Sequence, residues 1–528
     1  MNIQKTIAAA AALLFLLAGC TPANSPPETA PAAPNLTSVA EILLSDDVIQ
    51  VNGTPTGTDE DAAVYTANDI VYYEAGHDFT YGEGTQSDAH SPKEAAAHTV
   101  VHITQPGAYR LKGTLSKGQI AVDLGENAET DPEAVVTLIL DGVDITCEVA
   151  PAVIFYNVYE CGTGEAVADV DTSAAGANVI LADESENTIR GSYVARIYKP
   201  GSVILSEDGA EVEDAKKLHK YDGAFYSKMS MNIFGDKEDS GILNIYAENE
   251  GLGSEMHLTI NGGSINIYSG NDGINTNEDG VSVTTVNGGT LAITVTGETG
   301  KGDGIDSNGW LVINGGTVIA EGCANSADAG IDSDMGIHIN GGTVIATGHM
   351  LDRIEESGQN YAVFSFGQRN NNTEALTFRG ENGSIMFEYA FKNDFSILIY
   401  SSPMLTEGTY ALWQGDTQLK TVSGRNMMAG APGMQSMAPG DRPGEPGLES
   451  MNPGGDMPPQ LPDNMEFPEG TPPFDGQQPP DMPEPPLGGF PEQPDDSRNP
   501  GGNFPEMSQQ ATDQLHIQKG GNYFQVLS

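Results

Sequence analysis

Basic residues are scarce in this chain. Its 528 residues include 23 Lys and Arg against 74 Asp and Glu, which gives a formal net charge of −51. This charge repels nucleic acid and anionic lipid, so the composition argues against both as partners. An acidic polymer is repelled as well, unless a cation lies between the two surfaces.

Hydrophobic residues and cysteines are also few. The hydrophobic content of 38% is low for a globular enzyme of this length, and the chain has 4 Cys. In contrast, 64 Gly together with many Thr, Asn and Val suit an all-β fold with frequent tight turns. The region 46–204 has short alternating apolar segments and no long segment of helical period.

The N-terminus is typical of an exported lipoprotein. Lys5 precedes an apolar run, Ile7–Leu17, that ends in Leu-Ala-Gly-Cys at Cys20. The run is too short to span a bilayer, so we expect residues 1–19 to be a signal peptide and Cys20 to carry lipid. Residues 20–45 would be a tether, which places the protein outside the cytoplasm at the cell surface, with lipid as its sole membrane contact. The competing interpretation is an ordinary secretory signal with a coincidental cysteine.

The remaining cysteines leave two alternatives open. Cys147 and Cys161 are close enough in sequence to pair in an oxidising compartment, which would leave Cys323 free. The alternative is three small buried thiols.

A repeat occupies residues 223–348. A four-residue motif recurs at spacings of 22 to 31 residues, and the copies begin at Ala224, Gly251, Gly273, Gly304 and Gly330. Four copies are followed by a strand pattern and Asn-Gly-Gly, at Asn261, Asn287, Asn314 and Asn340. Such a period with short strands and no helix predicts a right-handed parallel β-helix from about Val100 to Gly348.

The repeat alignment also predicts stacked columns of side chains. Three inward columns are Phe225, Leu252, Ile274, Ile305, Ile331; Ile233, Ile260, Val286, Ile313, Ile339; and Leu243, Ile265, Leu291, Val318, Val344. The Asn-Gly-Gly segments would turn a corner of the chain, and their asparagines would hydrogen-bond up the column.

Composition divides the rest of the chain. We expect a β-rich entry region at 46–204, the repeats at 205–350, an irregular β-rich cap at 351–425, and a C-terminal strand at 511–528 that pairs with Thr409–Val422. Residues 426–510 are rich in Pro, Gly and Met and contain 14 acids against Arg442 and Arg498. This composition predicts a disordered loop.

Oxygen-bearing side chains follow the same repeat. Asn275, Asp306 and Asp332 share one column, while Asp272 and Asp303 directly precede their glycines. Carboxylate and amide oxygens stacked on successive repeats are ligands that Ca²⁺ prefers, and a cation would offset their repulsion. The competing interpretation is that these residues only fill turns.

Aromatic residues form a second candidate site. Tyr246 and Tyr268 follow equivalent inward isoleucines, and Trp310 occupies an outward column with His257. Exposed rings on a rigid sheet suit stacking on sugars. The competing interpretation is that the rings stack on one another.

Val136–Pro151, Asn187-Thr188, Asp222–Lys228 and the repeats resemble a family of bacterial carbohydrate-binding domain-containing lipoproteins. The resemblance covers about Val100 to Gly348. It implies a pectate-lyase-like parallel β-helix, calcium binding, and binding of cellulose-like or acidic (pectic) polysaccharides.

Two other functions compete with polysaccharide binding by a monomer. A lyase acting on uronate polymers needs a base, and the basic residues near the repeats are Lys228, Lys301 and Arg353, none of which recurs in a motif. A structural adhesin or spacer needs no ligand. The sequence carries no enzyme signature, so binding is the preferred interpretation.

Overall fold

The computed structural model describes residues 30–34, 36, 38–162, 164–206, 208–356, 358–370, 374–424 and 511–527. The predicted all-β fold is confirmed for these residues, whose helical elements are the single turns α1 (Pro92–Ala95) and η1 (Ala128–Thr130). No helix in these ranges has the length and hydropathy of a membrane span. The predicted signal peptide, Cys20 and the whole of the acidic segment 426–510 lie outside the described residues.

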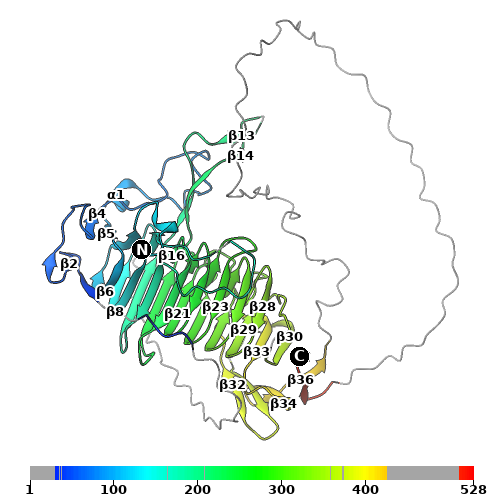
Figure 1. Ribbon diagram of the computed structural model, residues 1–528. Helices are drawn as coiled ribbons and strands as arrows, with labels where there is room; N and C mark the ends of the chain where they lie inside the picture. Colours follow the sequence, from blue (N-terminus) through cyan, green and yellow to red (C-terminus); the bar gives the residue numbers. More distant parts are fainter. Residues whose placement is uncertain are drawn as a thin grey trace, which may run out of the picture. The chain divides into compact units, whose positions relative to one another are not determined.

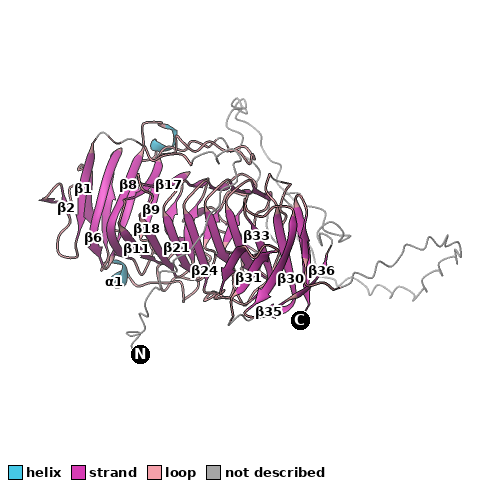
Figure 2. Cartoon of the chain, turned by 90° about the horizontal axis from the view of Figure 1, so that it is seen from below, coloured by secondary structure: helices cyan, strands magenta, loops and turns pink. Residues whose placement is uncertain are grey.

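Strands from successive repeats stack side by side in parallel ladders (Figures 1 and 2). The first ladder consists of β5 (Thr99–Ile103), β7 (Gly118–Asp123), β9 (Val153–Asn157), β16 (Gly223–Ser227), β19 (Glu250–Ser254), β22 (Ile274–Thr276) and β25 (Ile305–Ser307). The second consists of β10 (Ala177–Leu181), β17 (Met231–Gly235), β20 (Leu258–Ile260), β23 (Val283–Val286), β26 (Trp310–Ile313) and β28 (Gly336–Ile339). The third consists of β11 (Glu186–Gly191), β18 (Ile242–Ala247), β21 (Ser264–Ser269), β24 (Thr290–Val295), β27 (Thr317–Glu321) and β29 (Thr343–Gly348).

The three predicted inward columns are confirmed. Ile274 pairs with Leu252 on one side and with Ile305 on the other, and all three side chains are fully buried. The other two columns keep the predicted register through every repeat. One continuous apolar core therefore runs through the repeats.

Asparagines turn one corner of four repeats, as predicted. The side-chain amide of Asn287 donates to Asn261 Oδ1, that of Asn314 to Asn287 Oδ1, and that of Asn340 to Asn314 Oδ1, each at 2.9 Å. The second glycine of each Asn-Gly-Gly has a positive φ, for example 75° at Gly289, which L residues rarely adopt. The asparagine ladder thus ties neighbouring repeats together at this corner.

The ladders extend further toward the N-terminus than the boundary of the repeats at residue 205 suggests. The long strands β6 (Gly107–Leu115) and β8 (Val136–Thr146) pair in parallel, and β8 begins both the second and the third ladder. β1 (Val39–Leu44) adds a parallel strand to β6. The predicted tether is therefore wrong for residues 39–44, which belong to the sheet.

Short antiparallel elements flank this N-terminal part. They are β2 (Gln50–Val51), β3 (Thr54–Pro55) and β4 (Val64–Ala67), of which β4 pairs with β5. Between the first strands and the repeats, an arm projects from the row of strands (Figure 1). It consists of the antiparallel pairs β12 (Val194–Tyr198) with β15 (Lys217–Tyr221) and β13 (Ile204–Leu205) with β14 (Val212–Asp214).

A β cap covers the last repeat. β29 pairs antiparallel with β33 (Phe395–Ser401), which leads to β30 (Tyr361–Asn370), β38 (Gly521–Leu527) and β36 (Lys420–Ser423). A second sheet holds β31 (Leu376–Gly380), β32 (Ile385–Tyr389), β34 (Gly408–Gln414), β35 (Thr417–Gln418) and β37 (Leu515–Ile517). Aromatic residues fill the space between them. The predicted pairing of the C-terminus with Thr409–Val422 is confirmed, since Thr409 pairs with His516 and Thr421 with Val526.

The three described cysteines are free. Cys147 and Cys323 are buried and Cys161 is half-buried, so the structure corresponds to the alternative without a disulfide. Burial raises the pKa of Cys147 to about 12 and that of Cys161 to about 11, which keeps both thiols protonated.

The asparagine ladder makes a testable prediction. Asn287→Ala removes one acceptor and one donor in the middle of the ladder, and we expect it to lower the free energy of unfolding by about 1–2 kcal/mol. Asn340→Ala removes one bond at the end of the ladder and should cost about half as much. Urea unfolding measures both values. Equal losses of unfolding free energy in the two variants would show that the hydrogen bonds between asparagines add no stability beyond what each asparagine contributes to its own turn.

Candidate functional site

Carboxyl groups line one edge of the repeats, at the corner that leads into the first ladder. Glu250 N donates to Asp222 O (3.2 Å), Gly251 N to Asp272 O (3.0 Å) and Gly273 N to Asp303 O (2.9 Å). Four acidic residues that each precede a glycine are thereby stacked on successive repeats. Asp332 belongs to the column of Asn275 and Asp306, but its charge acts on Asp303, and Asp352 interacts with Asp332. We call these six residues the acid edge: Asp222, Glu250, Asp272, Asp303, Asp332 and Asp352.

Burial raises the pKa of Glu250, Asp272, Asp303, Asp332 and Asp352, and neighbouring negative charges add to the effect at Glu250, Asp303 and Asp332. Burial is the first cause for Asp303, followed by the charge of Asp332, and raises its pKa to about 9. The pKa of Asp272 rises to about 6 and that of Asp332 to about 7, again mainly through burial. Glu250 is 3% exposed, and its pKa lies well above the usual range because of burial and the charges of Asp222 and Asp272. The acid edge therefore resists carrying its full negative charge.

Two predicted metal ligands also hold the backbone. Asp272 Oδ1 accepts from Asp303 N at 2.7 Å, and Asp303 Oδ1 accepts from Ala329 N in the next repeat. Each carboxylate thus ties its repeat to the following one, as the turn-filling interpretation expects. This use occupies one oxygen of each group and leaves the other for a second interaction.

Three buried side-chain oxygens at this edge have no hydrogen-bond partner among the described residues. They are Glu250 Oε2, Asn271 Oδ1 and Asn275 Oδ1, and their side chains are 3%, 8% and 7% exposed. The amide of Asn275 donates to the other Glu250 oxygen at 3.0 Å, which places two of these side chains together. Buried acceptors without a donor are costly, and a hard cation satisfies such oxygens.

The predicted ligands are only partly brought together. Asn275 pairs with Asp306 in register, and Asp332 follows in the next repeat. Within the described ranges, no three His, Cys, Asp or Glu side chains converge on one point suited to a metal.

The predicted aromatic site has a different geometry from the expected one. Tyr246 and Tyr268 pair in register, and their rings stack at 5.3 Å with an interplanar angle of 9°. The Arg190 guanidinium lies 5.3 Å from the Tyr246 ring centre, and Lys392 Nζ lies 4.8 Å from that of Tyr268. Because β18 lies between β11 and β21, Tyr246 lies between Arg190 on one side and Tyr268 on the other. The ring faces predicted to bind sugar are thus covered, and Lys392 Nζ also donates to the Tyr268 hydroxyl at 3.5 Å.

Trp310 does not join the tyrosines. It belongs to β26 in the second ladder, where its half-buried ring lies 5.2 Å from that of His338. Val283 separates Trp310 from His257, which is buried and accepts a hydrogen bond from Val283 N through Nδ1 (3.1 Å). The three predicted sugar-binding aromatics therefore do not form one surface.

The basic residues considered for a lyase lie beside carboxylates. Arg353 Nε lies 2.6 Å from Glu355 Oε1. The positive charge of Lys301 favours the ionised form of Asp272, and that of Lys228 favours the ionised form of Glu255. Each of the three basic side chains thus faces a negative charge of this chain.

Sequence reasoning missed half of the acid edge. Asp222 and Glu250 precede glycines as Asp272 and Asp303 do, so the repeat alignment contained the signal. Asp352 lies after the last repeat, where no periodicity applies. Its carboxylate accepts from Ser333 N at 3.1 Å and interacts with Asp332.

Comparison with known proteins places this architecture in a family. Residues 97–362, half of the chain, match the model of a family described as carbohydrate-binding domain-containing protein. The chain belongs to this family. A family relative from Acetivibrio thermocellus (strain ATCC 27405) with the same description is 30% identical over 169 residues. The match spans 32% of this chain and 44% of the relative, so less than half of that protein is represented.

A solved structure is also similar. It is a gadolinium derivative of a polysaccharide lyase-like protein from C. thermocellum, with 20% identity, coverage of 58% of this chain and 94% of that chain, and a TM-score of 0.31. These values are too low for the likeness to bear on function.

The raised pKa values predict how stability depends on pH when calcium is removed by a chelator. The folded state keeps protons on Asp272, Asp303 and Asp332 at pH values where the unfolded chain has released them. These groups therefore favour folding at acidic pH, and that contribution is lost as the pH rises from about 4 toward 9. We expect the melting temperature in chelator to fall across this range.

The Asp303→Asn variant should show a shallower fall, because its side chain does not ionise. Calorimetry at a series of pH values tests both statements. A melting temperature that rises with pH in the unmodified protein would contradict the raised pKa values.

Proposed function

We propose that this chain is an extracytoplasmic, lipid-anchored, monomeric protein that binds acidic polysaccharide through calcium ions at the acid edge. Membership of the carbohydrate-binding family supports a polysaccharide partner. The observation that carries the calcium hypothesis is the set of unpartnered buried oxygens of Glu250, Asn271 and Asn275 beside carboxyl groups. The lipid anchor rests on the sequence around Cys20.

The donor set fits a hard cation. The three unpartnered atoms of Glu250, Asn271 and Asn275 are carboxyl or amide oxygens, which is the ligand chemistry of calcium. The charges of Asp222 and Asp272 act on Glu250. Two lysines offset part of this negative charge. Lys220 Nζ lies 2.8 Å from Asp222 Oδ2, and the positive charge of Lys301 favours the ionised form of Asp272. The remaining negative charge is what an added cation would neutralise.

Calcium would also explain how an acidic protein binds an acidic glycan. The net charge of −51 repels uronate polymers. Because few protein carboxylates converge, an ion at the edge would keep coordination positions for ligands from outside the chain, and a uronate carboxylate is such a ligand. The protein residues would orient and charge-balance the ion, while the glycan completes its shell.

We also infer that the ladders are the turns of a right-handed parallel β-helix. Each repeat adds one parallel strand to each ladder without a change of register. Parallel crossover connections are right-handed in nearly all proteins. This winding presents Asp222, Glu250, Asp272 and Asp303 on successive turns, so that an extended polymer can align with the acid edge.

Substitution of Asp303 tests the calcium hypothesis. The unmodified protein should melt at a higher temperature in millimolar calcium than in chelator, since the ion binds the folded state. Asp303→Asn keeps the acceptor for Ala329 N and removes the charge. We expect the variant to be at least as stable as the unmodified protein in chelator, to lose most of the calcium-induced rise, and to bind polygalacturonate about tenfold more weakly.

Glu238→Gln provides a control of equal charge change. Glu238 is exposed in the turn before β18, at the Asn-Gly-Gly corner. Its response to calcium and its affinity for polygalacturonate should match those of the unmodified protein. The calcium mechanism is rejected if calcium leaves the melting temperature unchanged and polygalacturonate binds equally well in chelator.

A further inference from the structure

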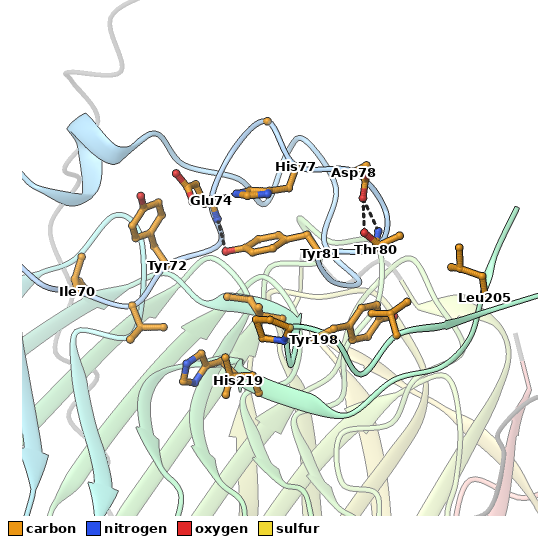
Figure 3. Close-up of a pocket in the computed structure, with 17 residues that line it drawn as sticks. Ile70, Tyr72, Glu74, His77, Asp78, Thr80, Tyr81, Tyr198, Leu205 and His219 are labelled. Carbon is orange, nitrogen blue, oxygen red and sulfur yellow. Dashed lines mark hydrogen bonds and ion pairs between the residues drawn. The ribbon is translucent and has the colours of Figure 1, made fainter. Parts of the chain in front are cut away.

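A second concave site lies outside the repeats. A cavity of about 870 Å³ opens between residues 70–81 and the arm formed by β12, β15 and the start of β13 (Figure 3). Residues 70–81 precede the family match, which begins at residue 97. This volume is within the range of small-molecule binding sites.

Backbone contacts fix the two walls of the cavity. Tyr198 N donates to Tyr81 O and Glu83 N donates to Arg196 O, at 2.9 and 2.8 Å. Gly82 lies between these contacts, and a Cβ there would come 2.1 Å from Arg196 O, so the close approach requires glycine. The cavity is therefore formed before any ligand arrives.

Three tyrosines line the cavity: Tyr72, Tyr81 and Tyr198. His77 stacks on one face of Tyr81, with ring centres 4.0 Å apart at 16°. Within the described chain, Tyr72 and Tyr198 have no ring stacked on them. All three are half-buried, so each combines a fixed position with accessible surface. Tyr72 and Tyr198 thus differ from Tyr246 and Tyr268, whose faces are covered, and from Tyr81, which the rings of His77 and Tyr73 contact.

The polar lining is acidic. The side chains of Glu74 and His77 are in contact, with 3.0 Å between Glu74 Oε2 and His77 Nε2. Asp78 Oδ1 accepts a hydrogen bond from the Thr80 hydroxyl at 2.6 Å. His219 faces the cavity from β15, and burial lowers its pKa, which favours the neutral ring. The lining contains no Lys or Arg. A ligand with a negative charge would meet two carboxylates and no fixed cation.

We propose that this cavity binds neutral pyranose units of a glycan. The apolar faces of such sugars pack on tyrosine rings, and their hydroxyls donate to carboxylates such as those of Glu74 and Asp78. Uronates are excluded by the same carboxylates. The site extends the proposed polysaccharide binding to a second sugar class, at a place that needs no calcium.

A proline-rich peptide is the other ligand that an aromatic groove can accept. Within this chain, the segment 426–510 has that composition. It contains 14 acids, which the carboxylates of the cavity disfavour. The charge therefore favours a neutral sugar.

Calorimetric titration of the full chain with neutral hexasaccharides (cellohexaose, maltohexaose and xylohexaose) in excess chelator tests the proposal. At least one should bind, and added calcium should leave its affinity unchanged. Tyr72→Ala and Tyr198→Ala should each weaken binding about tenfold or more, whereas Tyr72→Phe keeps the ring and should stay within about threefold.

Phe79→Ala is the matched control. Phe79 is an aromatic residue in the same segment, 48% exposed, and does not line the cavity. Its variant should bind like the unmodified protein. Melting curves of all variants establish that they are folded, and a variant that fails this check is replaced by the milder Tyr72→Leu or Tyr198→Leu.

Several outcomes would overturn the proposal. They are the absence of neutral-sugar binding in chelator, undiminished binding by folded Tyr72 and Tyr198 variants, or equal competition by hexagalacturonate in chelator. Displacement of the sugar by a synthetic peptide of residues 470–490 would assign the cavity to the proline-rich segment. Because the acid edge requires calcium, loss of polygalacturonate binding by Asp303→Asn with unchanged neutral-sugar binding separates the two sites.

Discussion

In-register parallel stacking is the constraint on which the rest of this structure depends. Equivalent residues of neighbouring repeats lie about 4.8 Å apart. Each residue therefore contacts the equivalent residues of the repeats above and below it. For isoleucine this proximity is favourable, and it creates the core around Ile274 and Ile305. For asparagine it creates a hydrogen-bonded ladder. For aspartate and glutamate it creates repulsion, which burial intensifies at the acid edge. One geometric rule thus produces both the apolar core and the mutually repelling carboxyl groups of the acid edge.

Periodicity explains how much of this could be predicted from the sequence. The columns through Ile274 and the ladder through Asn287 follow from counting residues, because the core tolerates one register. The same counting would have found Asp222 and Glu250, which share the acid-Gly pattern of Asp272. Asp352 could not be found this way, since it belongs to no repeat. The covering of Tyr268 was also hidden, because Lys392 comes from the cap, far along the chain.

The aromatic residues show why exposure predicted from a strand pattern is a weak guide to binding. Tyr246 points outward as expected, yet it contacts a ring on one side and a guanidinium on the other. Tyr72 lies in a segment with no repeat, and the structure places it at a cavity. Regular strands offer stacking partners to every side chain, whereas irregular segments leave side chains uncovered. On this chain, the concave surface comes from the parts that interrupt the repeat.

The return of the C-terminus to the cap has a consequence for the covalent chain. β36 and β38 pair directly, and β37 pairs with β34, so both ends of the segment 425–510 are held by backbone hydrogen bonds of the same domain. A protease that cuts within it would leave two polypeptides that stay associated through β30, β36 and β38. The protein would then run as two bands on a denaturing gel while remaining one particle in solution.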